Sequence, residues 1–465
     1  MEILLNHIKS QKNLEILLNH IKSQKNSIIN EKIIKNHDDN EKIDLQKYKI
    51  KNENKKSKDD DLSSDKIQRR IKVVEKLMSI EYPAQRSVKW FKMREGSITA
   101  SDSGQSLNLN HYTAQFDFIV KKVFPTPFPD NFPCYNGKKY ENIATMIYSF
   151  HNDVRVEEFG LILHPKYNFL AASPDGIVSK YKLDGKHKTN MVGRMLEIKC
   201  PTSRKLNHTG EIKGHICPLY YWIQIQNQLE CCDLDQCDFL QCKLKEYPNR
   251  QSFIDDTYEI TPYKSKSFKM EKGAVIQLVP KEKYGQIMDG DVNDPAIDND
   301  KYNKLIWGSA KWIYPPRIDM TPLDYDMWIS ETVQNLSENY PDFCLDRIYY
   351  WRLEDMTCDT VKRERDWFAE HIEKYKKIWN YVVYFRENKD KQEILSRFIK
   401  TFNFNNDGSF KDNANKRKNN SKIMKAISYL YNEEDEIIED DFDDYVEQLV
   451  NKTKKIPEDK EEKHH

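Results

Sequence analysis

The chain has 465 residues, of which 38% are hydrophobic and 32% charged, and its Lys plus Arg and its Asp plus Glu balance at 74 each. This length allows one large domain with extensions or two to three domains, and a net charge of zero means that an anionic partner must be met by a local basic patch. No apolar run reaches about 18 residues, which excludes a membrane-spanning helix, and the N-terminus lacks the apolar core of a signal peptide. Nine cysteines without a regular framework suit a reducing compartment, so we expect an intracellular protein.

Residues 1–66 are predicted to form a low-complexity arm. They begin with a tandem duplication, in which 1–13 (MEILLNHIKSQKN) and 14–26 (LEILLNHIKSQKN) differ only at the first residue. Two copies are too few for a solenoid, and the Lys-, Asn- and Asp-rich sequence that follows is typical of disordered chain. We therefore expect a largely disordered arm that catalysis does not need; a basic DNA-binding arm is the less favoured alternative.

Ordered sequence is predicted to start near Ile67. Apolar residues recur with helical spacing in 67–80, and WFKMREGS (90–97) predicts a helix that runs into a loop. Thr99–Ser101 is rich in N-cap residues and predicts the start of the next helix. Asn136–His151 predicts a further, well-formed helix.

Four strands are predicted in the middle of the chain, and a helix connects the last two. The segments 156–165 and 167–178 alternate like paired strands, and the polar stretch 179–194 reads as a long hairpin loop that leads into MLEIKCP. The strands are expected at 156–165, 167–178, 195–201 and 237–244, with the helix at 218–232. This order predicts an α/β fold in which a mixed central sheet is flanked by helices.

The pattern weakens after about residue 248. One strand is predicted within 268–284, an aromatic and basic segment at 304–317, and a strong amphipathic helix at the end of 347–385. We predict a core at 67–300, an aromatic-rich and mainly helical extension at 301–400, and a charged, disordered tail at 401–465 that contains the acidic block EEDEIIEDDFDD.

The chemistry centres on MLEIKCP. Glu197 and Lys199 occupy alternate positions of a strand, so their side chains share one face. Asp175 stands at the head of the strand joined to it through the hairpin loop, and antiparallel pairing would bring the three together. Two carboxylates suit Mg²⁺, which also takes waters and phosphate oxygens, and the lysine can orient an attacking water. The bare pattern is weak, since an ion pair on a solvated strand face explains it equally.

Five motifs occur together in this chain. They are ITAS (98–101), GKKYENIA (137–144), SPDG (173–176), LEIKCP (196–201) and a helix with Tyr-x-x-x-Gln-x-Gln (220–226). From about Gln85 to Cys242 the chain resembles the lambda-type exonucleases and the YqaJ-like viral recombinases of the PD-(D/E)xK nuclease superfamily. The resemblance implies a restriction-endonuclease-like core and Mg²⁺-dependent digestion of linear double-stranded DNA from the 5′ end, with Mn²⁺ as a substitute ion. The 3′ single strand left behind would serve recombination or repair.

The resemblance also assigns residue roles. Asp175, Glu197, the main-chain oxygen of Ile198 and Glu141 would hold the metal, and Lys199 would orient the attacking water. Arg94, Ser101 and Ser173 would bind the 5′-terminal phosphate, and Gln224 would lie near the active site. An ordinary structural explanation competes with the predicted role of each of the outer residues. Glu141 and Arg94 would then be surface side chains, and Ser101 a plain N-cap. Gln224 would lie on the polar face of a buried helix, a face that Tyr221 and Gln228 share.

Two other functions stay open. One is a structure-specific or restriction-like endonuclease on the same core, and the other is a non-catalytic DNA-binding recombination scaffold. The expected partners are double-stranded DNA ends and a single-strand-annealing protein, with no membrane; a homo-oligomer is compatible with the resemblance, and a viral source would place the protein in the cytoplasm or at a viral replication site. Segments 262–272 and 304–317 could line a DNA groove. The clustered cysteines at 231, 232, 237 and 242 lack zinc-site spacing and are expected in the core.

Overall fold

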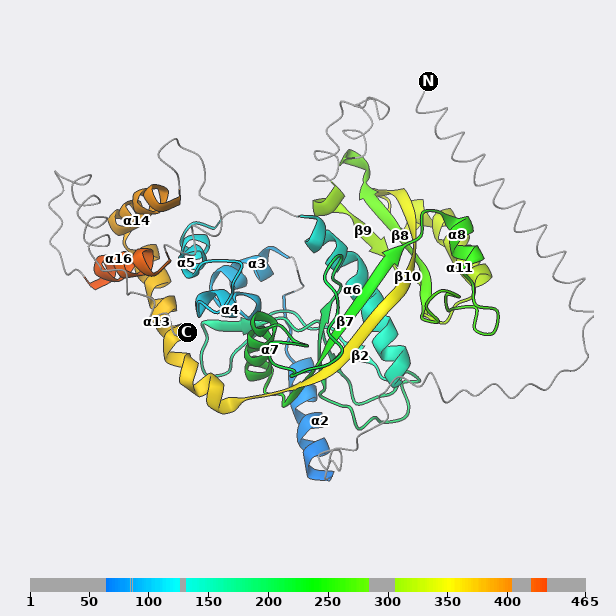
Figure 1. The fold of residues 1–465 in the computed structure, drawn as a ribbon, viewed down its shortest axis with the longest axis horizontal. Coiled ribbons are helices and arrows are strands. Elements are labelled where there is room, and N and C mark those ends of the chain that lie inside the picture. The colour runs from blue at the N-terminus through cyan, green and yellow to red at the C-terminus, as the bar shows by residue number, and fades with distance from the viewer. Residues whose placement is uncertain are drawn as a thin grey trace, which may run out of the picture. The chain divides into compact units, whose positions relative to one another are not determined.

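The computed structural model describes residues 64–125 except 84 and 86, 131–283, 306–403 and 420–432. The expectations for residues 1–63 and for the acidic block of the tail lie outside these ranges. The chain divides into two compact units, shown within the ribbon of Figure 1. Unit 1 takes residues 130–147 and 244–354, and unit 2 takes 67–129, 148–243 and 355 onward. The predicted domain ranges 67–300, 301–400 and 401–465 follow a different division and stay a prediction.

Unit 2 contains a small three-stranded sheet in the order β1-β4-β3. β1 (Ile98–Thr99) runs parallel to β4 (Leu170–Ala172), and β3 (Ile162–Leu163) pairs with β4 in antiparallel fashion. Every residue of β4 is buried, because apolar side chains on both faces pack into the core of the unit.

The larger sheet of unit 2 has the order β2-β5-β6-β7. Its strands are β2 (Val156–Glu157), β5 (Gly176–Val178), β6 (Met195–Lys199) and β7 (Gln236–Glu246). The first three pair in antiparallel fashion, whereas β6 and β7 are parallel. A parallel connection needs a crossover, which is made through α7 (Leu219–Cys232). The prediction of an α/β fold with a mixed sheet and flanking helices is confirmed.

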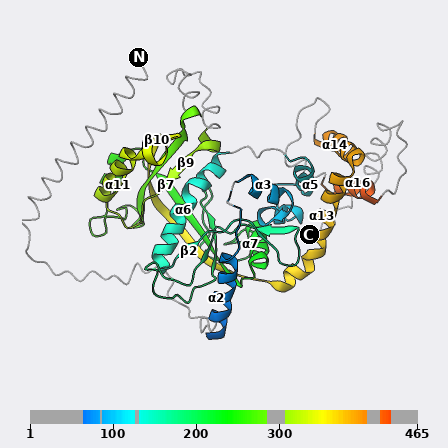
Figure 2. The same ribbon diagram turned by 180° about the vertical axis from the view of Figure 1, so that it is seen from behind.

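Helices from distant parts of the chain pack together in unit 2. The helices are α2 (Ser64–Met78), α3 (Val88–Glu95), η2 (Ala100–Asp102), α4 (Ser103–Ser106), α5 (Gln115–Val123), α13 (Arg365–Glu387), α14 (Lys389–Asn403) and α16 (Asn420–Asn432). α5 packs against α13 and α16, as the view from behind in Figure 2 shows. Their apolar faces share one core, with Phe116, Phe385 and Ile427 fully buried.

Unit 1 is built on three antiparallel strands in the order β10-β8-β9. They are β8 (Lys272–Pro280), β9 (Lys311–Ile313) and β10 (Phe343–Lys362). The helices of this unit are α8 (Arg250–Asp255), α11 (Pro322–Gln334), α12 (Leu336–Asn339) and most of α6 (Phe132–Asn152). Gly273 of β8 lies where a Cβ would collide with the rings of Tyr325 and Trp351, so the aromatic core of this unit requires glycine there.

Several elements were foreseen and others were missed. The sequence pattern indicated α3, the helix at 136–151, α7, β6 and a strand within 268–284, and each is present. The sequence indicated only the helix at the end of 347–385, whereas the structure has the long strand β10 before it. Among the helices that the structure describes, none is both long and apolar enough to cross a bilayer.

Candidate active site

The pairing of β5 with β6 brings the predicted carboxylates together. Gly176 lies opposite Leu196 and Ile177 opposite Met195, so the same register places Asp175 opposite Glu197. The Oδ2 atom of Asp175 accepts a hydrogen bond from the main-chain N–H of Ile198 at 2.6 Å. The expected meeting of Asp175 with the Glu197–Lys199 strand is therefore found, and the hairpin register produces it.

Glu197 is a buried carboxylate with three donors. Its side chain is 0% exposed, and Lys199 forms an ion pair with its Oε1 atom. Gln224 donates its amide to Oε1 at 2.7 Å and Gln228 donates to Oε2 at 2.7 Å. A buried charge is tolerated only when it is paired and hydrogen-bonded. The ion pair thus exists, but on a buried face and not on the solvated one that the ordinary explanation required.

Lys199 keeps its charge in this setting. Its ammonium group lies 4.8 Å from the centre of the Tyr221 ring. Burial alone would lower the pKa of Lys199, but the carboxylates of Glu197 and then Asp175 outweigh that effect and raise the pKa above its ordinary value. With 22% of its side chain exposed, the lysine is a cation that a ligand can reach.

Opposite faces of α7 serve different purposes. Gln224 and Gln228, one turn apart, point to Glu197 as their spacing predicted. Gln226 points the other way, where it donates to the main-chain oxygen of Lys362 at 2.9 Å and accepts from the N–H of Glu364 at 2.7 Å. One face of α7 is therefore fixed to the end of β10, and the other presents two amides to the carboxylate.

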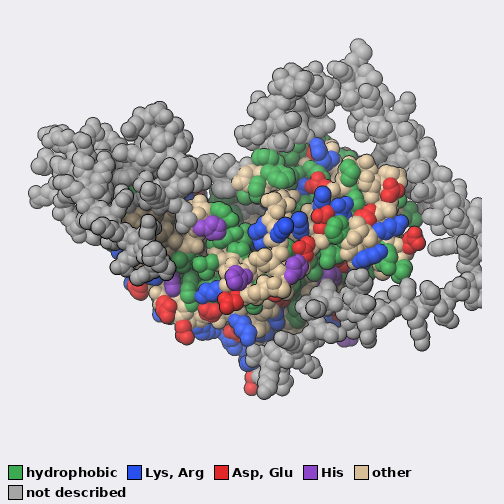
Figure 3. Space-filling view, in the orientation of Figure 1, with side chains coloured by type: hydrophobic (Ala, Val, Ile, Leu, Met, Phe, Trp, Pro, Cys, Tyr) green, Lys and Arg blue, Asp and Glu red, His purple; other side chains and the backbone are tan. Residues whose placement is uncertain are grey.

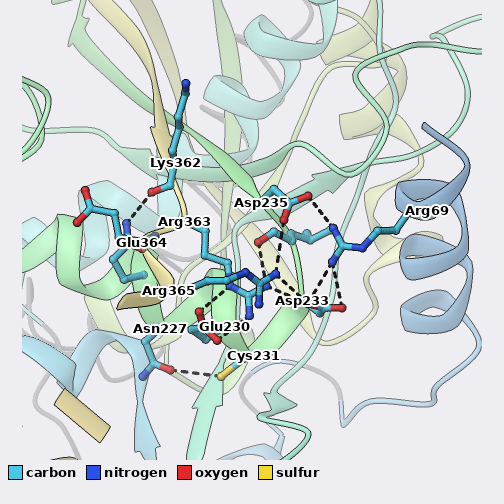
Figure 4. A network of polar contacts seen from close by, with 12 residues as sticks. Arg69, Asn227, Glu230, Cys231, Asp233, Asp235, Lys362, Arg363, Glu364 and Arg365 are labelled. Carbon is cyan, nitrogen blue, oxygen red and sulfur yellow. Dashed lines mark hydrogen bonds and ion pairs between the residues drawn. The ribbon is translucent and has the colours of Figure 1, made fainter. Parts of the chain in front are cut away.

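An ionic network strengthens that attachment (Figure 4). Arg363 binds Glu230 of α7 through two hydrogen bonds of 2.6 Å each, and the two side chains are only 6% and 9% exposed. Arg363 also donates to Asp233 at 2.9 Å, and Arg69 of α2 donates to Asp235 at 2.8 Å. The bidentate pair at the centre is the strong one, so it ties α7, which carries the two glutamines, to the residue that follows β10.

A second cluster forms around Ser101. β1 and β4 are parallel, with Thr99 opposite Ala171. Ser101 and Ser173 each come two residues after this pair, so both follow the same end of the small sheet. Arg94 donates to the Ser101 hydroxyl at 3.4 Å, and its guanidinium stacks over the Trp90 ring at 4.5 Å. The structure thus brings Arg94 and Ser101 together. The Ser173 hydroxyl donates to the main-chain oxygen of Gly160, and its predicted role stays a prediction.

Asp102 organises the cations near this cluster, a role that the sequence analysis did not anticipate. Lys121 contacts its carboxylate at 2.6 Å and Lys122 at 3.0 Å, and Thr99 donates to it at 2.8 Å. Burial opposes the charge of Asp102, but the two ammonium groups outweigh it and hold the pKa of the carboxyl well below its ordinary value. The buried aspartate therefore fixes two lysines beside the Arg94–Ser101 pair.

Glu141 lies on the part of α6 that belongs to unit 1. Its main-chain oxygen accepts a hydrogen bond from Thr145 one turn later, which is ordinary helix chemistry. Its predicted role at the metal stays a prediction.

The donor set around β6 fits a divalent metal ion. Asp175, Glu197 and the Ile198 carbonyl offer hard oxygen ligands, and Mg²⁺ commonly uses one or two carboxylates and completes its shell with waters and phosphate oxygens. Within the described residues, no group of three or more His, Cys, Asp or Glu is arranged to hold a metal. The site at β6 is therefore not one in which protein side chains alone would surround the ion. The Oε1 atom of Gln228 is buried without a hydrogen-bond partner in the structure, which leaves one more oxygen beside Glu197.

The clustered cysteines are core residues, as predicted. Cys231, Cys232, Cys237 and Cys242 are all buried, and these four form no disulfide. Burial raises the pKa of the Cys232 thiol to about 12, so this side chain is a neutral thiol in the core.

The family model of the YqaJ-like viral recombinase domain matches residues 89–235. The match begins in α3, includes the Arg94–Ser101 cluster and the β5–β6 hairpin, and ends just after α7. Residues 89–235 are therefore similar to the YqaJ-like viral recombinase domain. This agrees with the resemblance stated from the motifs.

Relatives of the chain extend beyond the YqaJ-like domain. An uncharacterized protein of Acanthamoeba polyphaga mimivirus is 39% identical over 336 residues, which are 71% of this chain and 57% of that protein. The chain thus spans little more than half the length of this relative. Among solved structures, the alkaline exonuclease LHK-Exo of Laribacter hongkongensis is 22% identical, with a TM-score of 0.26 over 34% of this chain and 74% of that one. The complex of LHK-Exo with dAMP is 24% identical, with a TM-score of 0.26 over 33% and 73% of the two chains.

Charges of both signs share the visible surface. In Figure 3, Lys and Arg side chains lie among Asp and Glu side chains on the described part of that face. This mixture matches the zero net charge of the sequence, so an anionic ligand would have to be met by a local group of cations.

Proposed function

We propose that the chain is a metal-dependent DNA exonuclease that digests linear double-stranded DNA from its 5′ ends and leaves 3′ single strands for recombination or repair. The observation that carries this proposal is the hairpin in which Asp175 lies opposite Glu197 with Lys199 two residues on. The match to a viral recombinase domain supports the role in recombination, and the mimivirus relative supports action inside an infected cell.

Each residue of the site has a part in the proposed reaction. Asp175, Glu197 and the Ile198 carbonyl would hold Mg²⁺ or Mn²⁺, with Glu141 assisting. The ion, when bound, supplies Lewis-acid chemistry that activates water and stabilises negative charge on the phosphate. Lys199 orients the attacking water and offsets charge that develops on the scissile phosphate. Gln224 and Gln228 hold Glu197 in place through its two oxygens.

The Arg94–Ser101 cluster would bind the 5′-terminal phosphate together with Ser173. A guanidinium fork and hydroxyl groups are suitable donors for phosphate oxygens. Ser173 and Asp175 belong to the same SPDG motif. A phosphate bound by Ser173 would therefore lie two residues along the chain from Asp175, one of the carboxylates that would hold the metal. Such a pocket would select ends and would pull the strand forward between cuts.

The test is digestion of end-labelled linear duplex and of a closed circle, each with Mg²⁺ and with EDTA. Mg²⁺-dependent loss of the linear DNA alone, from 5′ ends, is the expected result. Cutting of the circle would establish an endonuclease instead, and binding without cutting of either substrate would establish a recombination scaffold. Addition of a single-strand-annealing protein and measurement of the oligomeric state by light scattering would test those two expected associations.

A further inference from the structure

The helix that carries Arg94 has little apolar packing. α3 has eight residues, none of which is buried, and its Val88 and Phe91 are 73% and 50% exposed. A short helix is normally held by an apolar face that packs on its neighbours. The position of α3 must therefore depend on polar contacts at its ends, of which the N-terminal one is Ser87, whose hydroxyl accepts from the N–H of Trp90.

At the C-terminal end of α3, cations from two other helices replace the missing partners. The last four carbonyls of a helix receive no hydrogen bond from an N–H group of the same helix. Gly96 and Ser97 serve the carbonyls of Lys92 and Met93 locally, and the N–H of Ser97 also reaches the carbonyl of Arg94 at 3.4 Å. The carbonyl of Arg94 accepts from the Lys122 ammonium of α5 at 2.6 Å, and the carbonyl of Glu95 accepts from Arg386 of α13 at 2.8 Å.

Arg386 joins this end of α3 to the end of α5. Besides its bond to Glu95, its guanidinium donates to the main-chain oxygen of Lys122 from Nε at 2.9 Å and from Nη2 at 2.5 Å. Helix C-termini carry partial negative charge, which a cation stabilises, and the planar guanidinium can address two carbonyls at once. Arg386 thus links the end of α3, where Arg94 contacts Ser101, to the end of α5, where Lys122 contacts the neighbouring Asp102.

The C-terminal segment also holds the other end of α5. The Asn420 side chain of α16 accepts from the N–H groups of Gln115 and Phe116 at 3.0 and 3.4 Å, as an N-cap residue does. α16 is in turn tied to α13, where the Tyr384 hydroxyl donates to the Leu430 carbonyl. Residues after 365 therefore fix α5 at both ends and α3 at one.

We propose that Arg386 is a positioning residue for recognition of the DNA end: it sets the place of Arg94 relative to Ser101 by clasping α3 to α5. This inference rests on the proposed function, in which Arg94 and Ser101 bind the 5′ phosphate. Arg386 acts through main-chain carbonyls, so its loss should alter how well an end phosphate is bound and leave the chemistry at Glu197 unchanged.

The experiment compares the full chain with its variants Arg386→Gln, Arg386→Lys and Arg94→Ala on duplexes that differ only in a 5′ phosphate or a 5′ hydroxyl. Lys376→Gln is the control, since Lys376 is an exposed cation of the same helix. For Arg386→Gln we expect the preference for phosphorylated ends, measured as a ratio of kcat/KM, to fall about tenfold. This loss of preference should come from a higher KM for the phosphorylated duplex, and the rates on duplexes with 5′ hydroxyl ends should stay unchanged.

Two further readouts separate positioning from general loss of structure. Arg386→Lys should recover part of the preference, and Arg386→Gln should add nothing in an Arg94→Ala background, because coupled residues are not additive. Hydrogen exchange should speed up at Gly96 and Ser97 in Arg386→Gln. If that variant does not fold by circular dichroism, Arg386→Lys carries the kinetic test.

The outcomes are distinct. A wild-type protein that treats both ends alike would overturn the phosphate pocket and this inference with it. A wild-type preference that Arg94→Ala abolishes and Arg386→Gln retains would overturn this inference alone. An equal fall on both kinds of end in Arg386→Gln would show general destabilisation and would also contradict it.

Discussion

Gln228 donates its amide to the Oε2 atom of Glu197, and both side chains are fully buried. The other oxygen of the carboxylate is already shared by Lys199 and Gln224. Each side of Glu197 is therefore tied to a different residue, and the orientation of its carboxylate plane depends on Gln228.

Gln228→Ala should destabilise the protein and weaken metal binding. An unmade hydrogen bond to a buried charged group costs about 1–3 kcal/mol, and a Glu197 that is free to rotate should bind a divalent ion less tightly. Urea denaturation measures the first effect, and calorimetric titration with Mn²⁺ measures the second. An unchanged affinity for Mn²⁺ would show that Gln228 has no role in holding Glu197 for the metal.

Lys199→Ala should abolish cleavage while DNA binding is retained. Removal of one group that stabilises charge in the transition state typically costs about 10²–10³-fold in rate, whereas phosphate binding at Arg94 is separate. Single-turnover digestion and fluorescence anisotropy with a 5′-phosphorylated duplex check the two halves. Cleavage at the wild-type rate would remove the lysine from the mechanism.

Arg363→Ala should lower the free energy of unfolding by about 3–5 kcal/mol, because it leaves the buried Glu230 unpaired. Arg69→Ala is the matched control from the same network, since 46% of the Arg69 side chain is exposed and exposed ion pairs contribute about 0–1 kcal/mol. Chemical denaturation of both variants gives the comparison, and equal losses would contradict it.

Lys272 should make the stability of unit 1 depend on pH in the alkaline range. It is buried and donates to the Phe253 carbonyl and to the Thr257 hydroxyl, and burial lowers the pKa of its ammonium from 10.5 to about 8. Between these values the unfolded chain binds a proton that the folded chain has released, so the free energy of unfolding should increase as pH rises from 8 to 10.5, by about 1–3 kcal/mol. Denaturation at pH 7.5 and 10 tests this, and the increase should vanish in Lys272→Met.

The β5–β6 hairpin could be foreseen because its geometry is local. Period-two alternation in MLEIKCP and the polar loop before it predicted that Asp175 meets the Glu197–Lys199 strand, whereas the register that places Asp175 opposite Glu197 came from the structure. The helical spacing of Gln224 and Gln228 was equally readable, although the sequence could not show that both reach the same carboxylate. Contacts across the chain were not readable: Arg386 and Lys122 lie 264 residues apart, and no periodicity encodes their meeting.

β10 escaped prediction for a different physical reason. Of its twenty residues most are only partly buried, on both faces, so the alternation of apolar and polar side chains that marks a one-sided strand is absent. Charged residues such as Asp346, Arg347 and Glu354 interrupt it, and the strong helical pattern of α13 follows directly. Strand character here comes from pairing with β8 and not from local preference.

Neither unit is a continuous stretch of chain, and several of the crossings fall inside regular elements. The borders at residues 147/148, 243/244 and 354/355 lie within α6, β7 and β10. A protease that cuts only loops could not release either unit as an intact fragment. For the same reason, no single cut of the gene between two elements would separate the coding sequence of unit 1 from that of unit 2.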